Sequence, residues 1–98
     1  NFIKDPYTYT HKRELLDETF ELLGSQTRSC HLKDCILESG TTVAIKEVPL
    51  GEGTMEIAYY LEKIAQLDAD MPVLLEHLPD MAAYYRAIEW LKKNQLWR

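Results

Sequence analysis

Helix-periodic segments alternate with short apolar runs along this chain, and that alternation constrains its fold more than any other feature. Three segments with apolar residues every three to four positions predict amphipathic helices: 11–23, 54–67 and 80–91. Three short apolar runs precede them and predict strands: 1–3, 28–32 and 72–75. This order is typical of parallel strands joined by crossover helices, so we expect an α/β fold.

Capping residues and turns refine this prediction. Thr10, Thr54 and Asp80 are the expected N-caps of the three helices, and Gly24 is expected to end the first one. We expect a loop between residues 4 and 10.

Two further short runs, 35–37 and 42–45, flank a glycine-containing turn and predict a β-hairpin inserted between the second strand and the second helix. The run at 72–75 is apolar without interruption, which predicts a strand covered on both faces.

Size and composition narrow the classes of function. The chain has 98 residues, enough for a single domain over 1–98, with 46% hydrophobic residues and a net charge of −5. An acidic chain with scattered basic residues is a poor ligand for nucleic acid, and no apolar run approaches the roughly 20 residues of a membrane helix.

Cys30 and Cys35 do not make a disulfide scaffold, so we expect reduced thiols in a cytoplasmic protein. The first residue is Asn1 and no methionine precedes Met55, so we expect a natural start to be missing.

Two polar residues lie at the ends of predicted strands. His31 comes late in the strand at 28–32, and Glu76 comes directly after the run at 72–75. The carboxyl ends of parallel strands share one edge, where α/β proteins bind ligands. An imidazole and a carboxylate there suit a divalent ion such as Mn²⁺, Co²⁺, Zn²⁺ or Mg²⁺. The alternative is structural, with His31 hydrogen-bonded locally and Glu76 paired with Arg86.

Neighbouring groups have two interpretations each. Asp34 could orient the metal ligand His31 without binding the metal itself, or it could be a solvated residue after a strand. Gly51 and Gly53 could let the backbone approach a ligand or form a tight turn before a helix. His77 is expected to point away from Glu76 by strand alternation, if the strand extends that far.

Three segments, in order and spacing, resemble one enzyme family. The letters CHLKD at 30–34 are similar to a His-φ-Lys-Asp motif, VPLGEG at 48–53 to a Pro-x-Gly-x-Gly segment, and MPVLLEHL at 71–78 to a φ-x-φ-Glu-His strand. These are motifs of sugar phosphate isomerases and epimerases with a xylose-isomerase-like TIM barrel. Together they span about half of the chain.

The resemblance implies that the chain is roughly the last third of a (β/α)₈ barrel with an inserted β-hairpin. His31 would be a metal ligand at the end of the seventh strand, and Glu76 a metal ligand on the eighth that also acts as the catalytic base. Asn1 would contact a sugar or sugar-phosphate substrate, which reacts by proton transfer through an enediolate. The other ligands would precede Asn1, so the 98 residues alone would be inactive and would depend on a missing N-terminal barrel segment or on a homo-oligomer.

Two alternatives stay open. The same barrel could belong to a dehydratase or to an enzyme like the abasic-site endonuclease. The endonuclease carries an Asp-x-His pair between its motifs, whereas no histidine lies between His31 and His77 here. The chain could also be a complete, non-catalytic α/β interaction domain that binds a partner through its tyrosine-rich helices.

Overall fold

The computed structural model describes residues 3–38 and 43–97, which form helices and short strands in alternation. In chain order the elements are α1 (Pro6–Thr10), α2 (Lys12–Leu23), the 3₁₀ turn η1 (Gly24–Gln26), β1 (Cys30–Leu32), β2 (Asp34–Glu38), β3 (Ala44–Val48), α3 (Ile57–Leu67), β4 (Val73–Leu75) and α4 (Met81–Lys93). The fold is therefore mixed α/β, as the alternation predicts. Of the strand expected at 1–3, Ile3 lies outside any strand and the other two residues lie outside the described part.

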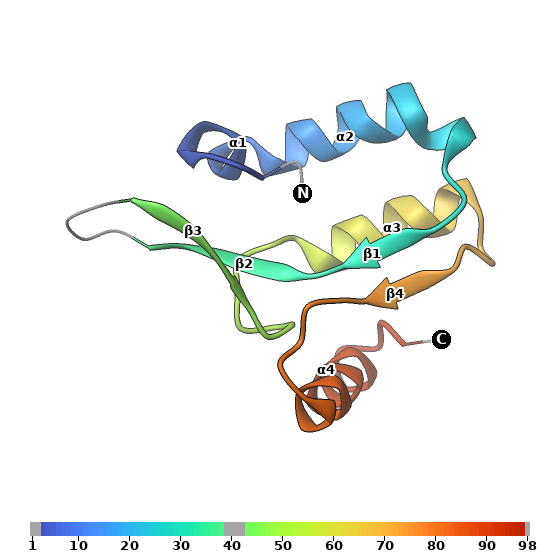
Figure 1. The fold of residues 1–98 in the computed structure, drawn as a ribbon. Coiled ribbons are helices and arrows are strands. Elements are labelled where there is room, and N and C mark those ends of the chain that lie inside the picture. The colour runs from blue at the N-terminus through green and yellow to red at the C-terminus, as the bar shows by residue number, and fades with distance from the viewer. Residues whose placement is uncertain (1–2, 39–42, 98) are drawn as a thin grey trace.

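The strands form two small sheets. β1 and β4 pair in parallel, with His31 opposite Leu74 and Leu32 opposite Leu75, and α3 lies in the connection between them (Figure 1). β2 and β3 pair antiparallel, with Asp34 opposite Val48. The expected hairpin is thus confirmed, although its second strand runs further along the chain than 42–45; residues 39–42 lie outside the described part.

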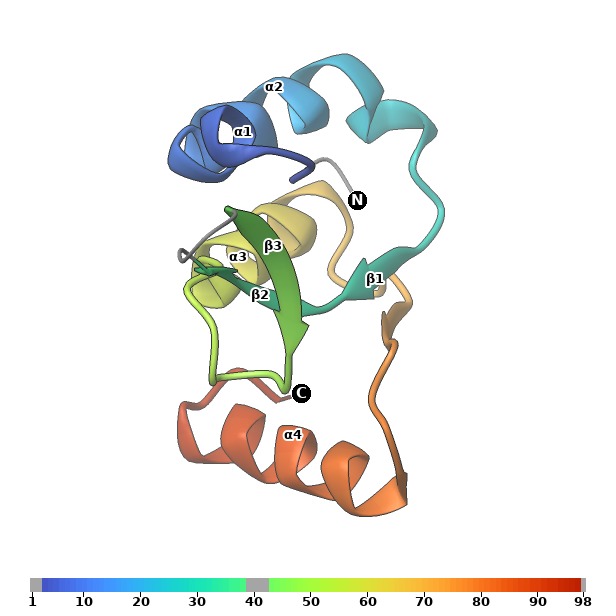
Figure 2. The same cartoon turned by 60° about the vertical axis from the view of Figure 1, so that its left-hand side comes forward.

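Helices lie on both sides of the strands. α1 and α2 form one layer, α4 lies on the opposite side of the molecule, and α3 and the strands lie between them (Figure 2). The largest buried cluster joins β1, α3, α4 and the segment that precedes α3, and it consists of Leu32, Leu50, Ile57, Ala87 and Leu91. This cluster holds the carboxyl end of β1 against two helices.

The loop expected at 4–10 is instead a short helix. Asp5 caps α1 through a capping box, because its carboxylate accepts from the backbone N–H of Thr8 while the Thr8 hydroxyl accepts from the backbone N–H of Asp5. Pro6 occupies the first turn, where its missing N–H costs nothing. The prediction was wrong because an Asp-Pro pair, common in loops, also begins helices: aspartate is a favoured N-cap and proline is favoured in the first turn.

Two other helix starts also differ from the prediction. α2 begins after His11 and α3 after Glu56, so neither Thr10 nor Thr54 is an N-cap. Asp80 does cap α4, accepting from the backbone N–H of Ala83 at 2.8 Å. Gly24 follows the last residue of α2, as expected.

β4 is not covered on both faces. Val73 is 36% exposed and Leu74 is 48% exposed, whereas Leu75 packs against the buried cluster. The expectation was wrong for this chain because Val73 and Leu74, which point to opposite faces of the strand, are both exposed in the part that the structure describes.

Gly51 has a backbone conformation that other residues rarely adopt. Its φ is +89°, and a Cβ there would lie 2.4 Å from Nε1 of Trp90 on α4. A side chain would therefore strain the backbone and also displace the indole ring from the core.

We therefore expect Gly51→Ala to lower the free energy of unfolding by about 2–4 kcal/mol, from the left-handed φ and the clash together. Gly24→Ala is the matched control: its φ is −55°, and a new Cβ would meet only the side chain of Leu67 at 3.3 Å. It should change stability by less than about 0.5 kcal/mol. Chemical denaturation measures both, and equal effects would contradict this account.

Candidate functional site

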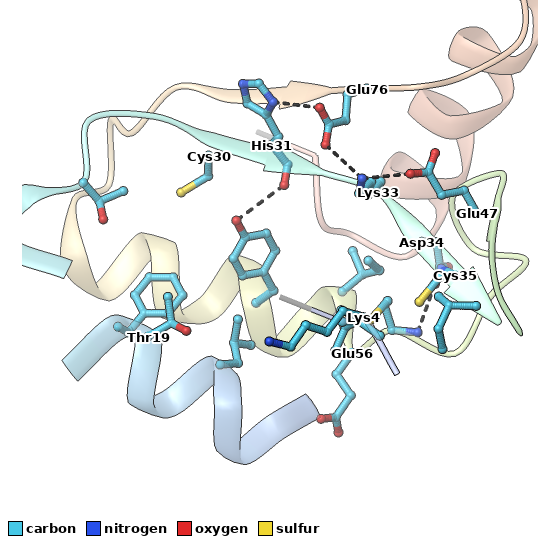
Figure 3. Close-up of a pocket in the computed structure, with 18 of the residues that line it drawn as sticks. Lys4, Thr19, Cys30, His31, Lys33, Asp34, Cys35, Glu47, Glu56 and Glu76 are labelled. Carbon is cyan, nitrogen blue, oxygen red and sulfur yellow. Dashed lines mark hydrogen bonds and ion pairs between the residues drawn. The ribbon is translucent and has the colours of Figure 1, made fainter. Parts of the chain in front are cut away.

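His31 and Glu76 lie at the carboxyl ends of the two parallel strands. Nδ1 of His31 is 2.8 Å from Oε2 of Glu76, although the residues are 45 positions apart (Figure 3). The parallel register explains this proximity, because the ladder continues past Leu75 through a bond of 3.3 Å from the N–H of Glu76 to the carbonyl of Leu32. His31 is exposed between buried Cys30 and Leu32, so it projects from the face away from the core.

Three further charged or titratable side chains extend this pair into a group of five, which we call the rim cluster: His31, Lys33, Glu47, Glu76 and His77. Nζ of Lys33 lies 3.6 Å from Oε1 of Glu76 and 2.9 Å from Oε1 of Glu47 (Figure 3). Glu47 comes from β3, so the hairpin delivers a carboxylate to the strand ends. No sequence signal points to Glu47, because only the antiparallel pairing brings it there.

His77 closes the rim cluster. Its Nδ1 is 3.0 Å from Oε2 of Glu47, and its Nε2 is 3.7 Å from Oε2 of Glu76. The expected alternation does not apply, because β4 ends at Leu75 and His77 has a φ of 59°. This left-handed conformation, uncommon outside glycine, turns the imidazole back towards both carboxylates.

The contacts within the rim cluster favour its charged forms. The pKa of Glu76 is lowered, chiefly by the hydrogen bond with His31, and that of Glu47 is lowered by its bonds with Lys33 and then His77. Burial acts to lower the pKa of Lys33, but the two carboxylates outweigh burial and raise it. Two carboxylates and one ammonium therefore coexist as ions at neutral pH.

Asp34 lies behind the rim cluster and is 1% exposed. Its carboxylate accepts four backbone N–H groups: those of Cys35 at 2.9 Å, Gly51 at 3.0 Å, Gly53 at 3.0 Å and Met55 at 2.9 Å. A Cβ on Gly53 would lie 2.2 Å from Oδ1 of Asp34, so only glycine permits this approach. Asp34 was expected to support His31; instead its carboxylate holds the segment between β3 and α3, and no hydrogen bond links it with His31 in the described residues.

A cavity of about 660 Å³ adjoins the rim cluster. His31, Lys33, Glu47 and Glu76 line one part of it, and α2 and α3 contribute apolar and aromatic side chains to the rest. The phenol of Tyr60 on α3 donates to the carbonyl of His31 at 3.5 Å, and burial raises the pKa of Tyr60. Tyr60 thus helps to fix the strand that carries His31.

Two of the predicted site features have no counterpart in the described residues. Asn1 lies outside them. Within residues 3–38 and 43–97, no three histidine, cysteine, aspartate or glutamate side chains gather in a group that could hold a metal ion. His77 and Glu47 lie beside His31 and Glu76, but in this part of the chain the four side chains do not form such a group.

Comparison with protein families, with curated proteins and with solved structures found no match to this chain. Over the described residues, no helix has the length and apolar character that crossing a membrane requires.

We expect Asp34→Asn to destabilise the protein by about 2–4 kcal/mol, because its amide NH₂ would face backbone N–H donors in a buried site. Asp68→Asn is the control, since Asp68 is exposed and its carboxylate accepts the N–H of Asp70 at 2.9 Å. Thermal or chemical denaturation measures the difference. A loss no greater than that of the control would show that the four bonds to Asp34 contribute little.

Glu47 makes the stability of the folded protein depend on pH, and the sign of this dependence follows from the lowered pKa of Glu47. The ion pairs of Glu47 stabilise the folded state fully above its unfolded pKa, near 4.5, and this contribution disappears as pH falls through the lower folded value. Urea midpoints should therefore separate wild type from Glu47→Gln at pH 7 and converge as the pH falls through the lowered folded pKa of Glu47. A separation that does not change over this range would contradict the prediction.

Proposed function

We propose that this chain is the C-terminal part of a (β/α)₈ barrel enzyme, a divalent-metal-dependent sugar or sugar-phosphate isomerase or epimerase. The observation that carries the proposal is the contact of 2.8 Å between His31 and Glu76 at the adjoining ends of two parallel strands. Barrel enzymes place their catalytic groups at this end of their strands. In the proposed barrel, β1 is the seventh strand and β4 the eighth.

The incomplete sheet supports a larger barrel. Parallel sheets are buried on both faces in nearly all proteins, yet here the face that carries His31 also exposes Leu74. Each of β1 and β4 has one strand neighbour among the described residues, which leaves an edge on either side. Further strands of a barrel would pair with these edges and enclose the exposed face.

The donor set fits part of a metal site. Imidazole and carboxylate are ligands of Mn²⁺, Co²⁺ and Zn²⁺, and donors bound to one ion at about 2.1 Å each lie roughly 3 Å apart. His31 and Glu76 already have nearly that separation, at 2.8 Å. The remaining ligands would come from residues that precede those described. When bound, such an ion polarises a carbonyl oxygen and lowers the barrier to removing a proton from the adjacent carbon.

Glu76 is the proposed catalytic base. Its carboxylate is ionised and is contacted on both oxygens, by Lys33 on one and by His31 and His77 on the other. Such contacts fix the direction of the lone pairs, which a proton-transferring group requires. Glu76 takes a proton from the carbon beside the substrate carbonyl. In an isomerase, Glu76 would return the proton to the neighbouring carbon. In an epimerase, a second acid from the rest of the barrel would donate a proton to the opposite face of the same carbon, because one carboxylate reaches only one face.

The test uses the full-length protein that contains this segment. We expect His31→Ala and Glu76→Gln each to lower Mn²⁺ affinity about 10- to 100-fold, as loss of a ligand or its support does. Glu76→Gln should also slow solvent deuterium incorporation into ketoses by about 10²–10⁴-fold. Metal analysis after dialysis and proton NMR in D₂O provide the two measurements.

Glu38→Gln is the control, because Glu38 lies on β2, outside the rim cluster, and pairs with Lys46 at 3.4 Å. This variant should keep the Mn²⁺ affinity and the rate of deuterium incorporation of the wild type. Unchanged metal affinity in both His31→Ala and Glu76→Gln would refute the proposal. If the 98 residues alone form a monomer that melts cooperatively and ignores both Mn²⁺ and chelator, the interaction domain becomes the better explanation.

A further inference from the structure

The substrate class can be narrowed by asking where a phosphate group would bind. In (β/α)₈ barrels, phosphates frequently bind at the loops after the seventh and eighth strands. On the proposed function, on which this inference rests, those loops are residues 33–56 after β1 and 76–80 after β4. Phosphate sites there use backbone N–H groups, helix N-termini and cationic side chains.

The backbone N–H groups of the first loop are already occupied. Gly51 and Gly53 form the glycine-rich segment that a phosphate would need, and both donate to Oδ2 of Asp34 at 3.0 Å. Met55 and Cys35 donate to the other oxygen of the same carboxylate. Because Asp34 is 1% exposed, this internal anion fills the place that a phosphate would take.

In the second loop, too, a carboxylate of the chain already accepts a backbone N–H that could bind a phosphate. This loop leads into α4, whose N-terminal N–H groups and dipole would attract an anion. The carboxylate of Asp80 accepts from the N–H of Ala83 at 2.8 Å and so already places a negative charge there. A phosphate would have to approach this carboxylate.

The ammonium group of Lys33, in the rim cluster, is already paired with carboxylates. Lys33 lies between Glu47 at 2.9 Å and Glu76 at 3.6 Å, so two carboxylates surround one ammonium. The described lining of the adjoining cavity contains four acidic residues, Asp34, Glu47, Glu56 and Glu76, and two lysines, Lys4 and Lys33. Glu56 pairs with Arg13 at 2.8 Å, so the other three carboxylates are set against the two lysines. Lys4 precedes α1 and lies across the cavity from the rim cluster (Figure 3). The excess of negative charge opposes a phosphate dianion, whereas carboxylates are good acceptors for sugar hydroxyl groups.

We infer that the substrate is an uncharged ketose or related polyol and not a sugar phosphate. Anion-binding groups at both loops are satisfied by this chain's own carboxylates, and the rim that faces the substrate is acidic. Glu47 acts as a specificity-determining residue in this arrangement, because it engages the one cation of the rim cluster.

The experiment compares matched substrates on the full-length protein with Mn²⁺. Free ketoses, such as D-fructose and D-xylulose, are paired with their terminal phosphates, and proton NMR in D₂O follows exchange at the carbon beside the carbonyl. We expect kcat/KM for the best free ketose to exceed that of its phosphate at least about tenfold, the ratio for 1.4 kcal/mol of unfavourable charge interaction. Equal values, or a preference for the phosphate, would overturn the inference while leaving the proposed function intact.

Absence of exchange with both members of every pair, in protein that binds Mn²⁺, would instead count against the proposed function, and the inference would fall with it. A second measurement does not depend on turnover: isothermal titration of the metal-free protein with inorganic phosphate. We expect no binding at millimolar phosphate, and tight binding would overturn the inference.

Variants test the role of Glu47. Glu47→Gln removes the carboxylate nearest to Lys33, so the preference for the free ketose should fall at least about threefold, a modest share of the effect of a like charge. Glu38→Gln, on the same hairpin but paired with Lys46, should leave the preference unchanged. An unchanged preference in Glu47→Gln would overturn the role of Glu47.

Discussion

The carboxylate of Asp34 organises the region between the two sheets, because it accepts backbone N–H groups from two places. One is Cys35, at the start of β2, and the other is the segment 51–55 between β3 and α3, through Gly51, Gly53 and Met55. A buried carboxylate is stable only when its charge is met by donors, so the segment must stay within hydrogen-bonding distance. The close approach requires glycine at position 53, and the turn requires glycine at position 51, against which Trp90 of α4 packs. The side chain of Asp34 thereby fixes the positions of the hairpin and of the segment before α3 relative to the end of β1, and α4 packs against the same segment through Trp90.

That arrangement positions the rim cluster. The hairpin leaves β1 at Asp34 and returns at Val48, so Glu47 necessarily lies beside the strand ends. There it meets Lys33 from the end of β1 and His77 from the segment after β4. The hairpin is therefore part of the site and contributes a charge to it, which an insertion serving only as a surface loop would not do. If the proposed barrel is correct, variation in this hairpin offers a direct route to variation in substrate.

Elements with strong local signals were predictable from the sequence. The stripes of α2, α3 and α4, the Asp80 cap and the hairpin follow from periodicity and turn chemistry, which act over a few residues. Helix starts were less predictable, because several residues near positions 5–12 and 54–57 could each cap a helix. Which of them does so depends on tertiary contacts: Thr54, for example, donates its N–H to the carbonyl of Cys35 and stays outside α3.

The sequence by itself determined that His31 lies in a strand and that Glu76 follows one, and parallel pairing made their approach a consequence of the fold class. Only the tertiary structure decided what surrounds them. Glu47 reaches the site through antiparallel pairing, and His77 through a left-handed backbone conformation after β4 ends. The role of Asp34 was also decided there, since its four donors lie up to 21 positions away. Periodicity describes which face of an element a residue occupies, whereas contacts between charged side chains depend on where separate elements meet in space.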